Sequence, residues 1–366
     1  MDPTTTFCPN LACPARGQTG QGHIGIHACK DKRFICTECH KTFSATKGTA
    51  CYRLRTSAET VSLVVTLRAH GCPLPAIVVA CGSDERTVVC WLARAGVQGQ
   101  AVQEHVVEQP RDLGQVQADE IRVKKQGGVV WRALAMMMRT RLWRAGEVRA
   151  HRDRPLMRRL SERVRPCAAH RPLLCCPDGL CAYVRAIRET FRDPERTGAP
   201  GRPRLRSWRN VCIAQVVKRY AQRRVVDVER RIVAGTPARV ETLRRRAQGD
   251  GVINTASIER LHATCRERLA SLTRRGRALA RRTRTLQHGM SLSGTVSHFC
   301  TPHASLAHAG RGTTPAMAAG ITDHCWPVRE LRSFPVPPPH WTPPPQRGRP
   351  SHALKRLIAR WCGDHG

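Results

Sequence analysis

The sequence predicts an α/β protein that carries a small metal-binding segment and a helical segment ahead of a larger mixed domain. Four cysteines near the N-terminus have the spacing of a zinc ribbon, and residues 56–98 have the pattern of short helices joined by a turn. Beyond residue 112, alternating apolar segments typical of strands are interleaved with amphipathic helical ones. A chain of 366 residues is long enough for two or three such domains.

The composition indicates a nucleic-acid partner. Lys and Arg number 62 against 27 Asp and Glu, a formal charge of +35. Such an excess opposes compactness unless a polyanion neutralises it, and the usual polyanion is nucleic acid. No apolar run approaches the ~18 residues of a spanning helix, and Met1–Thr6 lacks a signal-peptide pattern. We therefore expect no membrane partner and a cytoplasmic protein with reduced thiols.

The N-terminal cysteines predict one structural zinc ion in a ribbon over residues 1–55. Two short knuckles, separated by 22 residues, would let four thiolates meet tetrahedrally around Zn²⁺. Three nearby histidines, His23, His27 and His40, could compete, although nothing in their spacing supports this. The alternative is four unligated thiols. The predicted ligands are Cys8, Cys13, Cys36 and Cys39.

Residues 56–98 predict a helix-turn-helix. Gly82 would make the turn between two apolar helices, and Ser83 or Asp84 would cap the second. This places Glu85, Arg86 and Arg94 where they could enter a major groove. The alternative is a packing or dimerisation element without DNA contact. The polar, Gln-rich segment 96–111 predicts a linker.

Residues 114–131 predict the opening β-hairpin of the larger domain, with Asp119 and Glu120 inside its first strand. Carboxylates are uncommon in strands, so they need either a wet face or a cation. A third strand is predicted at 140–148 and a helix at 156–164. The apolar run 171–177 predicts a strand buried on both faces, which would leave Asp178 at its carboxyl edge; the alternative is an ordinary Asp-Gly turn.

The C-terminal half combines basic, helical and proline-rich segments. We expect a loop at 192–210, basic helices over 211–247 and an amphipathic helix at 254–272. The polar face of that last helix carries Glu259, His262 and Arg266, which alone indicates only a solvated surface. The tract 335–345 predicts an extended linker, followed by Arg347 and Arg349 in a minor-groove arm or a basic solvated tail.

Taken together, Asp119, Asp178 and Glu259 resemble the acidic triad of the ribonuclease-H-like core of DDE transposases. More narrowly, residues 8–325 resemble insertion-sequence-1-type transposases of bacteria, which also have a zinc ribbon and a helix-turn-helix. Two further segments carry this likeness, Pro-His-Ala-Ser-Leu at 302–306 and Thr-Pro-Ala-Met-Ala-Ala-Gly at 314–320. An insertion at 192–250 would account for the long spacing between the second and third acids.

The resemblance implies a catalytic domain at 112–325 and a Pro-rich basic tail at 326–366. It implies that Asp119, Asp178 and Glu259 hold Mg²⁺ or Mn²⁺ for cleavage and transfer of DNA strands. Its implied partner is double-stranded DNA, both the terminal inverted repeats and the target. It also implies that the chain forms a homodimer or a higher oligomer on DNA and is associated with the nucleoid. No role follows for Glu120.

Several positions depart from the family pattern, as in a decaying copy of a mobile element. His262 stands where Asn is expected, Pro177 precedes the second acid, and His40 follows the second cysteine pair where Gly would ease the turn. Ser257, and Ser297 with His298, also differ from the expected aromatic and Tyr-Asn residues. The alternatives are a DNA-binding protein without catalysis and a ribonuclease-H-like nuclease that does not join strands.

Overall fold

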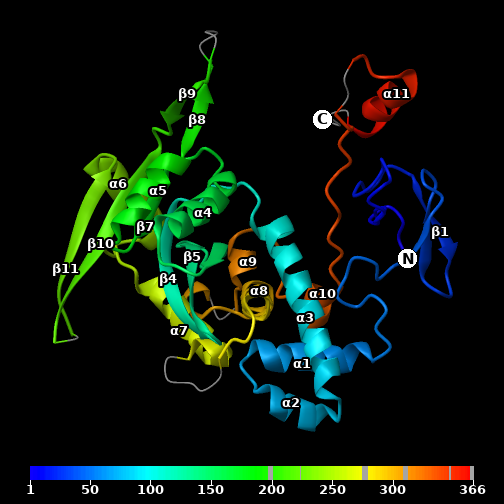
Figure 1. Cartoon of the computed structure of the whole chain (residues 1–366), viewed down its shortest axis with the longest axis horizontal. Coiled ribbons are helices and arrows are strands. Elements are labelled where there is room, and N and C mark those ends of the chain that lie inside the picture. Colours follow the sequence, from blue (N-terminus) through cyan, green and yellow to red (C-terminus); the bar gives the residue numbers. More distant parts are fainter. Residues whose placement is uncertain (197–200, 223, 274–278, 308–311, 346–347, 363–366) are drawn as a thin grey trace. The chain divides into compact units, whose positions relative to one another are not determined.

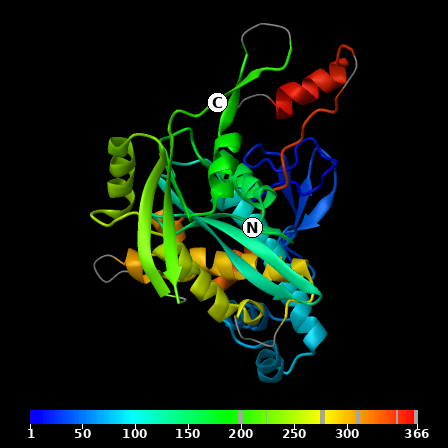
Figure 2. The ribbon, with the colours of Figure 1, turned by 60° about the vertical axis from the view of Figure 1, so that its left-hand side comes forward.

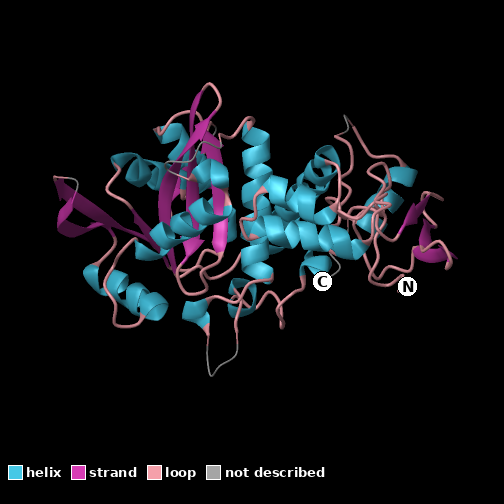
Figure 3. Ribbon diagram, turned by 90° about the horizontal axis from the view of Figure 1, so that it is seen from below, coloured by secondary structure: helices cyan, strands magenta, loops and turns pink. Residues whose placement is uncertain are grey.

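A mixed six-stranded sheet covered by helices on both faces is the centre of the fold (Figures 1 and 3). The computed structural model describes residues 1–366 except 197–200, 223, 274–278, 308–311, 346–347 and 363–366. The chain divides into two compact units. One comprises residues 1–58 with 332–366, and the other comprises residues 59–331.

The first unit joins the two ends of the chain. Its antiparallel sheet consists of β1 (Ile24–Ala28), β2 (Arg33–Cys36) and β3 (Thr42–Ser44). Helix α11 (His352–Trp361) packs on it through Trp361, whose carbonyl accepts a hydrogen bond from Gln18 at 2.8 Å. Residues 335–345 have no helix or strand, which confirms the predicted extended tract. Helix α11 follows the segment with Arg349, which is exposed, and buries Trp361.

Three helices open the second unit. They are α1 (Ala58–Ala69), α2 (Leu74–Cys81) and α3 (Glu85–Val102). Gly82 ends α2 with φ +57°, a left-handed conformation that favours glycine, and Asp84 caps α3 by accepting from the backbone N–H groups of Arg86 and Thr87. The predicted pair of helices around Gly82 is therefore confirmed.

The predicted linker at 96–111 is wrong, because α3 continues through it to Val102 and a π-helical turn follows at Gln103–Val107. Two glycines let α3 lie directly against α8 (Thr283–Phe299). A Cβ on Gly96 would lie 2.6 Å from the Cβ of His288, and one on Gly99 would lie 3.2 Å from a carbonyl oxygen of α8. The buried guanidinium of Arg144 then binds the carbonyls at the end of the segment.

The sheet has the strand order β11-β10-β7-β4-β5-β6. Strands β4 (Gln115–Lys125), β5 (Gly128–Met137) and β6 (Trp143–Arg149) pair antiparallel in sequence order. Strand β7 (Leu173–Pro177) lies parallel to both β4 and β10 (Val211–Ala221), and β11 (Arg224–Ala234) is antiparallel to β10. All of β7 is buried, as its apolar sequence predicts.

Helices α4 (Arg154–Val164) and α5 (Cys181–Thr190) cover one face of the sheet. Helices α6 (Pro237–Gln248), α7 (Ala256–Arg268) and α8 cover the other. Short elements complete the unit: β8 (Arg192–Glu195) and β9 (Arg204–Ser207), which pair with each other, α9 (Pro315–Ala318) and α10 (Val328–Ser333). No described helix is both long and apolar enough to cross a membrane.

The predicted basic helices at 211–247 are wrong over residues 211–234, which form the β10–β11 hairpin at the sheet edge (Figure 2). Among the described residues of this range, helix is confined to α6. The abundance of Arg suggested helix, whereas the β-branched residues of both segments favour strand. The expected loop at 192–210 likewise contains the β8–β9 pair.

We predict that Gly96→Ala destabilises the protein by about 1–3 kcal/mol, although alanine is the better helix former. The added methyl group would meet backbone atoms of His288 that cannot move away alone. Urea unfolding measures the change. Gly289→Ala, within α8, is the matched control, because its methyl group meets only a Leu269 side-chain tip at 3.3 Å. Equal stability of the two variants would contradict the close packing of α3 on α8.

Candidate functional site

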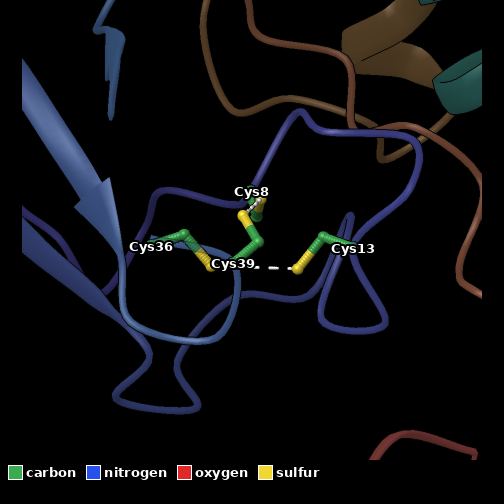
Figure 4. A group of neighbouring side chains, drawn as sticks. All are labelled: Cys8, Cys13, Cys36 and Cys39. Carbon is green, nitrogen blue, oxygen red and sulfur yellow. Dashed lines mark hydrogen bonds between the residues drawn. The ribbon is translucent and has the colours of Figure 1, made fainter. Parts of the chain in front are cut away.

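Four cysteines converge in the first unit (Figure 4). Their sulfur atoms all lie within 4.8 Å of one another, with Cys8 3.7 Å from Cys39 and Cys13 3.9 Å from Cys36. A tetrahedron of sulfurs 2.3 Å from a central Zn²⁺ has edges of about 3.8 Å. The group could therefore hold a zinc ion.

The backbone around the cysteines supports this convergence. His40 follows the second knuckle with φ +53°, the left-handed conformation for which the sequence pattern expects glycine. Burial raises the pKa of the Cys13 thiol to about 12, so an enclosed thiolate there needs a nearby cation. Among the described residues, the group contains none of the three histidines considered as competitors.

Three carboxylates converge at a second place, in the sheet of the other unit. Asp119, Glu120 and Asp178 each offer an oxygen atom within 4.8 Å of the others. Two of these were predicted from the sequence, and the third, Glu120, had no predicted role. The third carboxylate predicted from the sequence was Glu259, whereas in this structure the third member of the group is Glu120. Hard oxygen ligands of this kind are those that Mg²⁺ prefers, so the group could bind Mg²⁺.

The sheet register brings these carboxylates together. Ala118 of β4 pairs with Pro177, the last residue of β7, so Asp178 emerges beside the two acids of β4. Neighbouring residues of a strand point to opposite faces, and here Asp119 faces α7 while Glu120 faces α5. Because β7 ends at Pro177, both side chains can reach the space beyond its end. Asp178 is also held locally, accepting from the N–H of Leu180 at 3.0 Å.

Arg152 connects two of the carboxylates. Its guanidinium donates to Glu120 and, at 3.0 Å, to Asp178, and the Tyr183 hydroxyl donates to Glu120 at 2.8 Å. Burial and the charge of Asp178 nevertheless raise the pKa of Glu120 to about 7. Burial likewise raises the pKa of Asp178. The local cations thus compensate the negative charge only in part.

His262 is placed against Asp119. Its Nδ1 lies 3.3 Å from an oxygen of Asp119, and the residue is 2 % exposed. Gln117 fixes the start of α7, since its side-chain oxygen accepts from the N–H of Ile258 at 3.0 Å. His262 was predicted to contact DNA; in this structure its ring is buried against the carboxylate of Asp119.

Glu259 lies outside the carboxylate group. It accepts from the Thr255 hydroxyl at 2.6 Å and pairs with Lys218 of β10. Its side chain is 46 % exposed, as in the solvated-face alternative. The charge of Lys218 also acts on Asp178, where it opposes in part the rise in pKa that burial causes. Glu267, further along α7, is exposed and is not part of the group either.

The other predicted DNA contacts differ in their exposure. Glu85 and Arg86 are exposed in the first turn of α3, and Arg94 and Arg266 are half-buried. Arg349 is exposed, and Arg347 lies outside the described residues.

Sequence reasoning missed four residues around the carboxylates. The position of Glu120 beside Asp119 was the one signal available. Long-range packing alone brings in the others, which lie 26 to 63 residues from their partners in the sequence and follow no motif. The four residues are Glu120, Arg152, Tyr183 and Lys218.

No protein-family model matches the chain, and no curated protein matches it either. Its own residues therefore carry the functional argument.

We predict that the whole chain binds one more equivalent of zinc than its Cys36→Ser variant, because a thiolate is removed from a four-ligand site. Metal analysis after gel filtration measures the difference. Cys90→Ser, which changes an exposed cysteine of α3, is the control and should leave the zinc content unchanged. Zinc content unaffected by Cys36→Ser would contradict the site.

We also predict a pH dependence of stability from Glu120 in metal-free buffer. Its folded-state pKa is raised, so the folded state binds the proton more tightly than the unfolded state. Protonation of Glu120 should therefore stabilise the folded state as pH falls through about 7. This gain in unfolding free energy is complete below about 4.5, the ordinary pKa of a glutamate, and amounts to about 1–3 kcal/mol. The change in unfolding free energy between pH 8 and 6 should be smaller in Glu120→Gln. An equal change in both proteins would contradict the raised pKa.

Proposed function

We propose that the protein is a divalent-cation-dependent enzyme that cleaves and joins DNA strands, as a transposase does. The observation that carries this proposal is the convergence of Asp119, Glu120 and Asp178 where a buried parallel strand ends. Carboxyl ends of parallel strands are the usual place for ligand groups in such sheets. The mixed sheet with helices on both faces also supports the ribonuclease-H-like interpretation.

A cation explains the arrangement of the charges. Three carboxylates within 4.8 Å repel one another, and burial together with this repulsion raises the pKa values of Glu120 and Asp178. Arg152 neutralises part of the charge by contacting Glu120 and Asp178. A divalent cation would supply the rest, with Asp119 and Asp178 as ligands and with Arg152 giving up at least one bond.

The chemistry of the site divides among residues of this chain. When bound, Mg²⁺ or Mn²⁺ would polarise a phosphodiester and lower the pKa of a nucleophilic hydroxyl. Asp119 and Asp178 hold the oxygen ligand positions, and His262 keeps Asp119 in place. Lys218, beside the carboxylate group, would offer a positive charge to a phosphate oxygen after its ion pair with Glu259 breaks.

The third metal ligand of this proposal is either Glu259 or Glu120. In the family resemblance it is the third metal ligand, which requires it to leave Lys218 and turn toward the other acids. The other candidate for the third ligand is Glu120, whose carboxylate lies near those of Asp119 and Asp178. Because both carboxylates neighbour the site, substitution of each one separates the two hypotheses.

The partner that fits best is double-stranded DNA carrying the element's terminal repeats. The net charge of +35 favours a polyanion, and Arg86 is exposed at the beginning of α3. The four-cysteine ribbon would add a second DNA-binding module, with zinc as its cofactor.

We predict that Asp119→Asn and Asp178→Asn each reduce Mg²⁺-dependent DNA cleavage by more than about 100-fold, because metal ligands matter more than their supporting residues. DNA binding should be kept or rise slightly, since a negative charge is removed. A duplex carrying the flanking terminal repeats is incubated with Mg²⁺, and nicked and joined products are scored.

Glu189→Gln is the control for this experiment, because Glu189 on α5 pairs with Arg154 away from the carboxylate group. Loss of cleavage in Glu259→Gln but not in Glu120→Gln would assign the third ligand to Glu259. Nicks without joined products would favour a nuclease. Cleavage that persists in Asp119→Asn and Asp178→Asn would refute the proposed active site.

A further inference from the structure

A second feature of the larger unit is a cavity of about 550 Å³ on the side of α7 that faces away from Glu259. It is enclosed by α7, α8, the ends of β5 and β6, and residues 301–305. Its residues on α7 follow helical spacing, at Ser257, Arg260, Thr264 and Arg268. The volume lies in the ~300–1,000 Å³ range of small-molecule sites.

The cavity is positively charged and has no acidic lining residue among those described. Arg141, Arg260 and Arg268 line it, and none of the three forms an ion pair with a described carboxylate. Arg141 donates to the hydroxyls of Ser257 at 2.7 Å and Ser305 at 3.3 Å.

Arg268 donates to the hydroxyl of Ser297, and Arg260, which is exposed, has no hydrogen-bond or ion-pair partner among the described residues. Arg152, Arg154 and Arg163, by contrast, all bind carboxylates. Burial lowers the pKa of His303 in the same wall, and the positive charges of Arg141 and Arg260 lower it further. A site of this kind is electrostatically incomplete without an anion.

One wall of the cavity is apolar. Met136, Met138 and Leu261 line it, together with part of the Trp143 ring. Methionine side chains adapt their shape and make favourable contacts with aromatic rings. The cavity therefore combines two neighbouring guanidinium groups suited to phosphate, those of Arg141 and Arg260, with a surface suited to a flat aromatic group.

We propose that this cavity binds a nucleoside phosphate, with the phosphate at Arg141 and Arg260 and the base against Met136 and Met138. The nucleoside phosphate could be one residue of a DNA strand or a free nucleotide, and both present the same chemistry to the cavity. If it belongs to DNA, the inference deepens the proposed function by giving the protein a pocket for a single unstacked nucleotide.

Isothermal titration of the whole chain tests the proposal, in EDTA so that the carboxylate site takes no part. The probes are deoxyadenosine 5′-monophosphate, deoxyadenosine and a single-stranded DNA of five nucleotides. Arg260→Ala should weaken binding of the monophosphate by roughly tenfold, the loss of one charge-assisted hydrogen bond. Arg260→Glu should weaken it further.

Two control variants make the result specific. Arg158→Ala changes an exposed arginine of α4, on the opposite face of the sheet, and should leave the affinity unchanged. Asp119→Asn should also leave it unchanged, which separates this proposal from the catalytic one. Circular dichroism checks that each variant is folded; Arg260 is exposed, so its substitution leaves the core intact.

A free nucleotide is a sufficient ligand if the protein binds the monophosphate, if it binds deoxyadenosine more weakly than the monophosphate, and if Arg260→Ala weakens binding of the monophosphate. Binding of the five-nucleotide DNA alone, with the same sensitivity to Arg260→Ala, supports a DNA strand as the source. Equal affinity for deoxyadenosine and its monophosphate, or affinities unaffected by both substitutions of Arg260, would overturn the proposal.

Discussion

The parallel pairing of β7 with β4 is the constraint on which the carboxylate site depends. Because Ala118 lies opposite Pro177, the end of the buried strand places Asp178 beside Asp119 and Glu120. A shift of one residue in this register would send Asp119 to the face of α5 and Glu120 to the face of α7. Burial of β7 on both faces, between the α4–α5 and α6–α8 layers, makes such a shift costly.

Arginine gives this strongly basic protein two kinds of local environment. Around the carboxylates, Arg152 serves as an internal counter-ion, which compensates part of the charge of the three acids. In the cavity beside α7, none of the three arginines pairs with a described carboxylate, and two of them, Arg141 and Arg268, contact hydroxyls. The first environment favours a bound cation and the second a bound anion, and α7 contributes a different face to each.

Local pattern was sufficient for much of the fold, and long-range packing explains what it missed. Strong signals gave the β4–β5 hairpin, the buried β7, the Gly82 turn and the convergence of four cysteines, because each rests on spacing or turn chemistry within a short segment. Helices were predicted where the β10–β11 hairpin lies, because the arginines of these segments favour helix and were given more weight than the β-branched residues, which favour strand. The helical course of residues 96–107 depends on the contact of Gly96 and Gly99 with α8, which no local pattern reveals. Glu120 acquires its place only from Tyr183 and Arg152, distant in sequence.

The central claim is that Asp119, Glu120 and Asp178 form one divalent-cation site. The most direct measurement is a crystal structure of the protein with Mn²⁺ and a DNA end, with anomalous scattering recorded at the manganese edge. We expect an anomalous peak coordinated by Asp119 and Asp178, with Arg152 released from at least one of its two carboxylates. A map with no peak between these residues, and Arg152 still bound to Glu120 and Asp178, would contradict the account.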